Sequence, residues 1–548
     1  MPRRWPRRVL LGTFVVLALA ACGTGESRED PSSKTVETVP GGTNADDAAS
    51  AIATPRPKRI ILISLDTVGS RNVGGYSDAQ TPTMEEIAAD GVRFEQFYAA
   101  STYTLPSHMS MLTGLDPIEH GVVNVPSRLA PEVPTLASQL RAAGYFTKAV
   151  AEGGFVAEVY GFDQGFSDFT TLNQPKALVW TSIWGVLDWM RGQKDAPYFL
   201  FLHTYIAHTP YDGFNDFRNR HPELDLPDDQ EIAALKAKYP SNPDAPNPAP
   251  RDIPVELRHM CTFYNMDSAT ASDFLGCGDH RIKPDFLQSE HFEVYREGLL
   301  EAHRASIRRG DHMVGQVRDV LIELGQLEDT LLIVTSDHGE AMFEHSLHGH
   351  DYTPYNEVLK VPLFLSYPRR ISGGQVVRGL TWHLDLVPTI LSLAQVPFDP
   401  NLRGRDLTPV MLQQETIPED RVIHPLLLRP CKRTYLPMQR MTLEGDFKFI
   451  PGHRHYGDPK GLLFDLTSSP DEKDNLRESR PELFARLRKL ALDYDASLTP
   501  GKPIHQETKE RISPFPGEVE PLELSSEWQR QLEALGYIFE DDDSDGAE

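Results

Sequence analysis

The sequence predicts an α/β protein built on a mostly parallel β-sheet with helices on both faces. Continuous apolar runs that are rich in β-branched or aromatic residues are typical of buried parallel strands, and they occur at 59–65, 198–202 and 331–335. Helical patterns lie between these runs at 83–90, 135–143 and 297–324. Because strands that alternate with helices form parallel sheets, we expect functional side chains at the carboxyl ends of the strands.

The sequence pattern changes after residue 412. Short antiparallel strands are predicted at 440–450 and 461–466, and an amphipathic helix at 481–494. We therefore expect a main domain at 58–412, which would carry the site, and a smaller α+β subdomain at 413–497.

Residues 212–290 interrupt the alternation of strands and helices. They include a proline-rich stretch at 239–250, which can form neither a regular helix nor a central strand. We interpret 212–290 as an insertion, and two interpretations of it stay open: a lid over the substrate or a passive surface excursion.

The N-terminal segment 1–22 resembles a bacterial lipoprotein signal peptide. Its basic start precedes an apolar stretch at 9–21 that is short for a membrane span and is followed by Cys22. The resemblance implies that Cys22 becomes the lipidated first residue and anchors the protein in the bacterial cell envelope, at the outer membrane or on the periplasmic side. An ordinary signal peptide is the alternative. The polar stretch 23–57 would be a flexible tether.

The formal net charge of −25 argues against nucleic acid as a partner. It also opposes adsorption to an anionic membrane surface, so a lipid would have to provide the anchor. The segment 498–548 is predicted to be a tail that is acidic at its end. Cys261 and Cys277 could form a disulfide in an oxidising compartment, and this question and the oligomeric state stay open.

Polar residues that can bind a cation follow two of the predicted strands. Asp66 follows 59–65, whereas Asp337 and His338 lie just after 331–335. Alone, each has a structural explanation, since an Asp in such a turn commonly makes local hydrogen bonds. Together, two carboxylates and an imidazole at one sheet edge are suitable ligands for a divalent cation.

Thr104 is a candidate nucleophile. Pro106 suits the first turn of a helix, so we expect a helix to begin near Thr104. The positive potential of that helix N-terminus would act on the Thr104 oxygen and on any bound anion. A divalent cation on the same oxygen would further lower the pKa of the hydroxyl.

In their order along the chain, these features resemble the sulfatase family of the alkaline phosphatase superfamily. The resemblance covers about residues 58–494, and the segments that carry it are 65–67, 104–114, 120–124, 336–340, 361–363, 384–389 and 463–476. It implies an alkaline-phosphatase-like fold and one divalent cation held by Asp66, Asp337 and His338, with Thr104 on it. The resemblance to sulfatases favours Ca²⁺ as the ion, whereas the imidazole ligand suits Mn²⁺ or Zn²⁺, and Mg²⁺ is also compatible.

The resemblance assigns roles to further residues. Asn124 would bind a non-bridging ester oxygen, and His108 replaces an arginine that binds substrate beside the nucleophile. His208 and His350 would contact the transferring group or protonate the leaving oxygen. For each of these histidines a structural role is the alternative. Three other histidines are expected to be structural: His345, His348 and His383.

The departures from the family pattern bear on the chemistry. Sulfatases make a formylglycine from Cys or Ser at the position of Thr104, and threonine cannot give that aldehyde because its Cβ carries a methyl group. Glu152 stands where sulfatases have a Lys-x-His pair. We therefore expect no formylglycine and fewer fixed cations for sulfate.

These observations predict a metal-dependent hydrolase of an anionic ester. It would cleave phosphate, phosphodiester or phosphonate esters through the Thr104 nucleophile. If a lipid or glycan hydroxyl replaced water, the same site would be a transferase. Two alternatives stay open: a sulfuric ester hydrolase, that is a sulfatase, without formylglycine, and a non-catalytic envelope protein that binds a glycan or a partner.

Overall fold

The computed structural model describes most of the predicted folded body. The described residues are 55–124, 127–172, 174–193, 195–209, 211, 292–350, 353–428, 439–452, 458–505 and 509. Outside them lie the predicted signal peptide, the tether up to residue 54, the insertion at 212–290, the end of the tail and all 4 cysteines. Among the helices of the described part, none combines the length and the apolar character that a membrane span requires.

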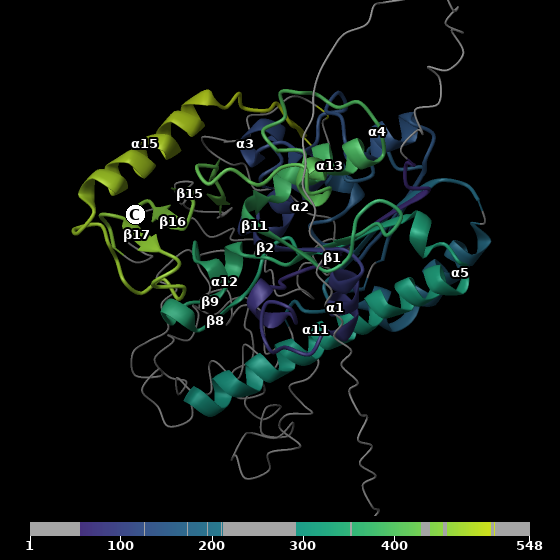
Figure 1. Cartoon of the computed structure of the whole chain (residues 1–548), viewed down its shortest axis with the longest axis horizontal. Coiled ribbons are helices and arrows are strands. Elements are labelled where there is room, and N and C mark those ends of the chain that lie inside the picture. The colour runs from purple at the N-terminus through teal and green to yellow at the C-terminus, as the bar shows by residue number, and fades with distance from the viewer. Residues whose placement is uncertain are drawn as a thin grey trace, which may run out of the picture. The chain divides into compact units, whose positions relative to one another are not determined.

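An eight-stranded sheet forms the centre of this body (Figure 1). Its strand order is β11-β2-β10-β7-β1-β6-β4-β5. The strands are β1 (Arg59–Leu65), β2 (Val92–Tyr98), β4 (Phe146–Ala151), β5 (Asp168–Thr171), β6 (Tyr198–Thr204), β7 (Thr330–Thr335), β10 (Leu363–Ser366) and β11 (Gln375–Trp382). Strand β10 is antiparallel to β2 and β7, and the other neighbouring pairs are parallel. The predicted α/β class with a mostly parallel sheet is confirmed.

The three apolar runs of the sequence form the adjacent strands β7, β1 and β6. Every residue of these strands is buried, which is why they lack the polar alternation of a half-exposed strand. Ser64 of β1 is opposite both His203 of β6 and Thr335 of β7. This register brings the carboxyl ends of the strands side by side, with Asp66 and Asp337 just beyond them.

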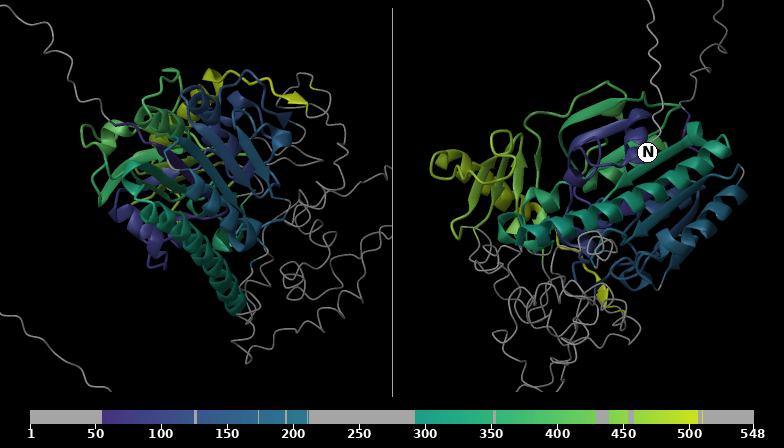
Figure 2. Two further views of the ribbon diagram at one scale, coloured as in Figure 1. Left: turned by 90° about the vertical axis from the view of Figure 1, so that its right-hand side faces the viewer. Right: turned by 90° about the horizontal axis from the view of Figure 1, so that it is seen from below.

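Helices cover both faces of the sheet. One layer consists of α1 (Pro82–Ala89), α5 (Ile183–Gly192) and α11 (Phe292–Glu323). The other layer includes α2 (Thr104–Thr113), α4 (Leu136–Ala142) and α13 (Leu386–Leu393). Ile61 and Ile63 pack in the first layer and Ile60 and Leu62 in the second, because successive side chains of a strand point to opposite faces. Figure 2 shows the long α11 lying along its face of the sheet.

The C-terminal subdomain is a four-stranded antiparallel sheet with one long helix. The strands are β12 (Val422–Ile423), β15 (Thr442–Glu444), β16 (Phe447–Ile450) and β17 (Leu462–Asp465), and the helix is α15 (Pro481–Ser497). Leu487 and Ala491 of α15 pack on Phe449 and Leu463 of the sheet. The predicted small α+β unit is therefore present.

Short elements complete the described fold. The helices are α3 (Pro117–His120), α12 (Asn356–Leu359) and α14 (Thr408–Met411). The strands are β3 (Ser127–Arg128), β8 (Ala341–Met342), β9 (His348–Gly349), β13 (Leu426–Leu427), β14 (Gln439–Arg440) and β18 (Ile504–His505). Strand β18 pairs with β3, so residues just beyond the predicted subdomain also join the body.

Buried polar contacts attach the subdomain to the main domain. Lys448 Nζ lies 2.7 Å from Glu472 Oε1 within the subdomain and donates to Asn356 Oδ1 of the main domain at 2.9 Å. Arg440 donates to Asp116 Oδ2 at 2.8 Å and to Asp116 Oδ1 at 3.1 Å. Removing one partner of such a pair leaves an uncompensated buried charge, so these contacts specify one docking arrangement.

Candidate active site

The candidate site lies at the carboxyl edge of the central sheet. Asp66 follows β1 directly, and Asp337 and His338 lie in the turn that begins one residue after β7. Thr104 is the first residue of α2. All four side chains are fully buried. The predicted cation ligands and the predicted nucleophile, which are far apart in the sequence, are therefore brought together.

The turn after Asp66 holds an unusual backbone conformation. Thr67 has φ of 59°, in the left-handed region that a β-branched residue rarely adopts. Its N–H donates to Asp337 Oδ1 at 3.3 Å, and its carbonyl accepts from His303 Nε2 at 3.2 Å. Val68 N donates to Ser336 Oγ at 3.0 Å. These bonds compensate for the strain and join the two ligand-bearing turns.

Gly339 sets the path of the second turn. A Cβ at this position would lie 2.2 Å from the carbonyl oxygen of Glu357 and 2.9 Å from the Cα of Gly69, so only glycine fits. The carbonyl of Gly339 accepts a hydrogen bond from His338 Nδ1 at 3.0 Å. This bond fixes the tautomer of His338 and leaves the lone pair of Nε2 to face the site.

The donor set around His338 suits a divalent cation. His338 Nε2 lies 3.2 Å from Thr104 Oγ1 and 3.2 Å from Asp337 Oδ2. The ligand atoms of Asp66, Asp337 and His338 lie within 4.8 Å of one another. Asp66 Oδ1 and Asp337 Oδ2 are buried and have no hydrogen-bond partner among the described residues. A cation would compensate for these two oxygens, which would otherwise be costly to bury.

The electrostatics of the two carboxylates differ. Burial raises the pKa of Asp66 well above its ordinary value, and the nearby Asp337 raises it further. Burial also disfavours ionisation of Asp337, but the imidazoles of His338 and His108 bring the pKa of this carboxyl below its ordinary value. Without a cation, the pair is therefore easier to hold with one negative charge than with two.

His108 lies beneath the site. Its side chain is fully buried, its Nδ1–H donates to Thr104 O at 3.1 Å, and its Nε2 accepts from Ser64 Oγ at 2.9 Å. Nδ1 also lies 3.4 Å from Asp337 Oδ2. These contacts place His108 among the candidate ligands, and its role as a substrate contact stays a prediction.

His350 and His208 lie on the other side of His338. The His350 ring stacks on the His338 ring at 4.3 Å between centroids, and the His208 and His350 rings are 5.4 Å apart. His350 Nδ1–H donates to Glu340 Oε1 at 3.1 Å, and His208 Nδ1–H donates to Thr209 O at 2.7 Å. Burial lowers the pKa of His208 to about 3, so it is neutral without substrate.

Asn124 lies in the segment after α3. Its side-chain oxygen accepts a hydrogen bond from Ser127 Oγ at 3.2 Å, and its side chain is almost fully buried. The contact with an ester oxygen that the family resemblance implies stays a prediction. His383 donates from Nε2 to Ser336 O at 2.9 Å and accepts from Ala100 N at 3.2 Å, so both of its nitrogens bond backbone groups.

Sequence reasoning did not single out His203 or Glu340. His203 Nε2 lies 3.4 Å from Asp66 Oδ2, and Glu340 binds His350. His203 could have been found from the strand register. It continues the apolar run at 198–202, and in the sheet it lies opposite Ser64 of β1. The register could not be known before the order of the strands was known.

Glu152 forms hydrogen bonds to segments near the ends of β4 and β6. Its carboxylate accepts four hydrogen bonds, from the backbone nitrogens of Lys176 (2.6 Å), Leu178 (2.9 Å) and Tyr205 (2.7 Å) and from Thr204 Oγ1 (2.8 Å). A carboxylate that satisfies several donors in this way holds backbone in place. Glu152 therefore forms a structural contact between β4, β6 and the segment before α5.

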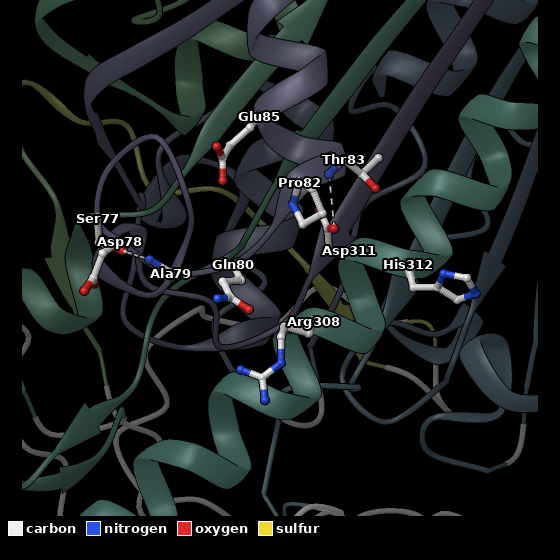
Figure 3. Close-up of a pocket in the computed structure, with 10 residues that line it drawn as sticks. All are labelled: Ser77, Asp78, Ala79, Gln80, Pro82, Thr83, Glu85, Arg308, Asp311 and His312. Atoms are coloured by element: carbon white, nitrogen blue, oxygen red, sulfur yellow. Dashed lines mark hydrogen bonds between the residues drawn. The ribbon is translucent and has the colours of Figure 1, made fainter. Parts of the chain in front are cut away.

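A separate hollow lies where α1 meets α11 (Figure 3). Its lining comes from residues between 77 and 85 and from Arg308, Asp311 and His312 of α11. Asp311 accepts hydrogen bonds from Thr83 N at 3.2 Å and Met84 N at 2.9 Å, and so caps the start of α1. None of the predicted site residues lines this hollow.

Comparisons with known proteins identify the family. The Sulfatase family model matches residues 58–396, and the model for the C-terminal region of N-sulphoglucosamine sulphohydrolase matches residues 344–490. The chain belongs to the sulfatase family. It is therefore an ester hydrolase of that family, and the buried Asp and His cluster fits the divalent metal that sulfatases typically bind.

The relatives matched by sequence include sulfatases from an animal and from a bacterium. Arylsulfatase A from Homo sapiens is 27% identical over 511 residues, which cover 83% of this chain and 91% of the human protein. N-acetylglucosamine-6-O-sulfatase from Bacteroides thetaiotaomicron is 24% identical over 479 residues, covering 77% of this chain and 83% of that protein.

Solved structures share the fold. A structure in complex with its substrate D-glucosamine-2-N,6-O-disulfate has a TM-score of 0.62 at 18% identity and covers 80% of this chain and 98% of that chain. The phosphonate monoester hydrolase SpPMH from Silicibacter pomeroyi has a TM-score of 0.58 at 18% identity, with coverages of 81% and 96%. At this level of identity, the likeness concerns the fold alone.

Proposed function

We propose that this protein is a metal-dependent hydrolase of phosphate, phosphodiester or phosphonate esters, with Thr104 as its nucleophile. The observation that carries the proposal is the position of Thr104 Oγ1, buried at the start of α2 and 3.2 Å from His338 Nε2. The residue stands where sulfatases carry formylglycine, and its Cβ methyl group prevents that modification.

Asp66, Asp337 and His338 would hold one divalent cation. Ca²⁺ is the ion that the family resemblance favours, and Mn²⁺, Zn²⁺ or Mg²⁺ is compatible with an oxygen and imidazole donor set. When bound, the cation lowers the pKa of the Thr104 hydroxyl and neutralises charge on the ester.

The side chains of the site account for both bond changes. The Thr104 hydroxyl gives its proton to solvent, and its Oγ then attacks phosphorus as the bond to the leaving oxygen breaks, while the N-terminus of α2 stabilises the added negative charge. The leaving oxygen takes a proton from His208 or His350. A bound dianion favours protonation of these imidazoles and so opposes the effect of burial on His208. Water then cleaves the phosphorus–Thr104 bond and restores the hydroxyl.

The charges of the site argue against the arrangement by which sulfatases bind sulfate. Sulfatases bind a sulfate monoanion with fixed cations at positions that here hold His108 and Glu152. Burial lowers the pKa of His108, and Glu152 is a carboxylic acid, so neither supplies a fixed positive charge. A dianionic phosphate ester can gain more from a single divalent cation than a sulfate monoanion can. The shared fold with phosphonate monoester hydrolases is compatible with this proposal.

Sulfuric ester hydrolysis without formylglycine is the second candidate. The observation that favours it is the set of relatives, since the matched proteins are sulfatases by name, including arylsulfatase A and N-acetylglucosamine-6-O-sulfatase. A sulfated sugar would then be the substrate class. A non-catalytic binding role is disfavoured because Asp66, Thr104, Asp337 and His338 are together.

The location and the lid also remain proposals. A lipid on Cys22 would anchor the protein in the cell envelope through the tether at 23–57, and the insertion at 212–290 would cover the substrate. A labelled fatty acid that enters the wild-type protein, but not Cys22→Ala, would support the anchor. Equal labelling of the two would reject it.

The experiment for the proposed function is turnover by the full-length, detergent-solubilised protein. The substrates are p-nitrophenyl phosphate and the corresponding phosphodiester, phosphonate and sulfate esters. Each is tested with Ca²⁺, Mg²⁺, Mn²⁺ or Zn²⁺. We expect cleavage of phosphorus esters that Thr104→Ala abolishes and Thr113→Ala, at the other end of the same helix, retains. Cleavage of the sulfate alone would overturn the proposal in favour of the second candidate.

A further inference from the structure

A second group of potential ligands adjoins the first. In the described part of the chain, Asp66, His108 and His203 each offer one ligand atom, and these atoms lie within 4.8 Å of one another. All three side chains are fully buried. They come from the turn after β1, from α2 and from β6, so the tertiary structure alone brings them together. Asp66 belongs to both groups.

The distance between Asp66 and His203 fits two ligands of one ion. Asp66 Oδ2 and His203 Nε2 are 3.4 Å apart, which is long for a hydrogen bond to a carboxylate. Two ligand atoms that each lie about 2.1 Å from a cation, at the tetrahedral angle, are about 3.4 Å apart. The two imidazole rings lie edge to face at 4.7 Å between centroids, so both can border one small volume.

The hydrogen bonds of His108 indicate which of its nitrogens could bind a cation. Nδ1–H donates to Thr104 O, as the second nitrogen of a metal-bound histidine commonly does, so the lone pair is on Nε2. In the structure Ser64 Oγ donates to this Nε2 at 2.9 Å, so a cation would take the place of that hydrogen bond and leave an oxygen beside the group. His203 would offer its Nε2, which is the nitrogen that lies near Asp66 Oδ2.

We propose that Asp66, His108 and His203 form a second divalent-cation site, with Ser64 beside it and the Asp66 carboxylate common to both sites. Two imidazoles and one carboxylate favour Zn²⁺ or a similar transition metal over Ca²⁺ or Mg²⁺. The site does not depend on which ester the enzyme cleaves.

The test is the zinc content of the full-length protein. Protein stripped with a chelator is equilibrated with Zn²⁺, dialysed free of unbound metal and analysed for zinc per chain by mass spectrometry. We expect two equivalents in the wild type and one in His203→Gln, His108→Gln or His338→Gln. His312→Gln, an exposed histidine on α11, should retain two. One equivalent in the wild type, or two in His203→Gln, would overturn the second site.

Cobalt substitution of the wild type covers the case in which the variants fail to fold. Because Asp66 is common to both sites, adding a second equivalent of Co²⁺ should produce magnetic coupling and reduce the electron paramagnetic resonance signal per cobalt. A signal that grows in proportion up to two equivalents would reject the shared carboxylate. Two zinc equivalents without turnover of any ester would reject the proposed function and retain this site.

Discussion

Thr104 Oγ1 lies 3.2 Å from His338 Nε2 although 234 positions separate the two residues. The contact joins the start of α2 to the turn after β7 and puts a hydroxyl among buried cation ligands. The proposed chemistry depends on this relationship, because a threonine hydroxyl becomes an effective nucleophile only when its negative charge is stabilised.

Substitutions of Thr104 should show whether catalysis requires its hydroxyl oxygen. Thr104→Ser retains the oxygen, so we expect kcat within about tenfold of the wild type, whereas Thr104→Ala should lower kcat by about a thousandfold or more. Steady-state kinetics on the best phosphorus ester would measure both. Similar rates for the two variants would show that Thr104 is not the nucleophile.

The dependence of the rate on the leaving group should reveal the roles of His208 and His350. If His208 or His350 is the acid, its change to Gln should slow cleavage of an alkyl ester by about a hundredfold or more, and of a p-nitrophenyl ester much less, because p-nitrophenolate needs no proton to leave. Kinetics on the two ester types would measure this difference. Equal losses on both would point to a binding or structural role.

Metal removal should destabilise the fold as well as stop turnover. Asp66 Oδ1 and Asp337 Oδ2 lack hydrogen-bond partners in the described structure, so a cation that compensates for them would stabilise the folded state. A cation at a hundred times its Kd should add about 2.7 kcal/mol to the free energy of unfolding. Calorimetry with and without chelator would measure it. Asp337→Asn should lose this increment, and Asp188→Asn, on the surface of α5, should keep it.

Gly339→Ala should be strongly destabilising. The new Cβ would lie 2.2 Å from the Glu357 carbonyl oxygen, so the backbone of the second ligand-bearing turn would have to move, at a cost of about 3 kcal/mol or more. Denaturant unfolding would measure the loss. Gly192→Ala, where a Cβ meets nothing within 4 Å, is the matched control and should change stability little. An equal effect of the two changes would contradict the steric argument.

Acid should destabilise the protein through its buried histidines. Burial and, to a smaller extent, the nearby Arg440 lower the pKa of His424 to about 3, whereas an unfolded histidine has a pKa of about 6.5. The unfolded state therefore binds more protons between these values, so stability is complete above about pH 6.5 and falls as the pH drops toward about 3. Between these pH values, each such histidine contributes about 1.4 kcal/mol per pH unit to the slope of the free energy of unfolding against pH.

Replacement of His424 would test this assignment. His424→Gln should reduce the slope of unfolding free energy against pH by about 1.4 kcal/mol per unit, and the exposed His312→Gln should leave it unchanged. Urea unfolding at several pH values would measure both slopes. An unchanged slope in His424→Gln would show that folding does not lower the pKa of this imidazole.

Much of the architecture could be predicted from local sequence. The runs at 59–65, 198–202 and 331–335 are apolar throughout because β1, β6 and β7 are buried on both faces. The helix predicted at 83–90 is α1 at Pro82–Ala89, and the helix predicted at 297–324 begins earlier, as α11 at Phe292–Glu323. The antiparallel direction of β10 was not predicted, since strand direction depends on the path of the chain between strands.

The sequence by itself determined the family pattern, the buried strands and the types of side chain at their carboxyl ends, because periodicity and motif spacing are local properties. Only the tertiary structure decided which of these side chains meet. It paired His203 with Asp66, turned Glu152 to backbone donors and stacked His350 on His338. These contacts follow from strand order and helix packing, which arise from the burial of the whole core and therefore cannot be assigned to any single segment.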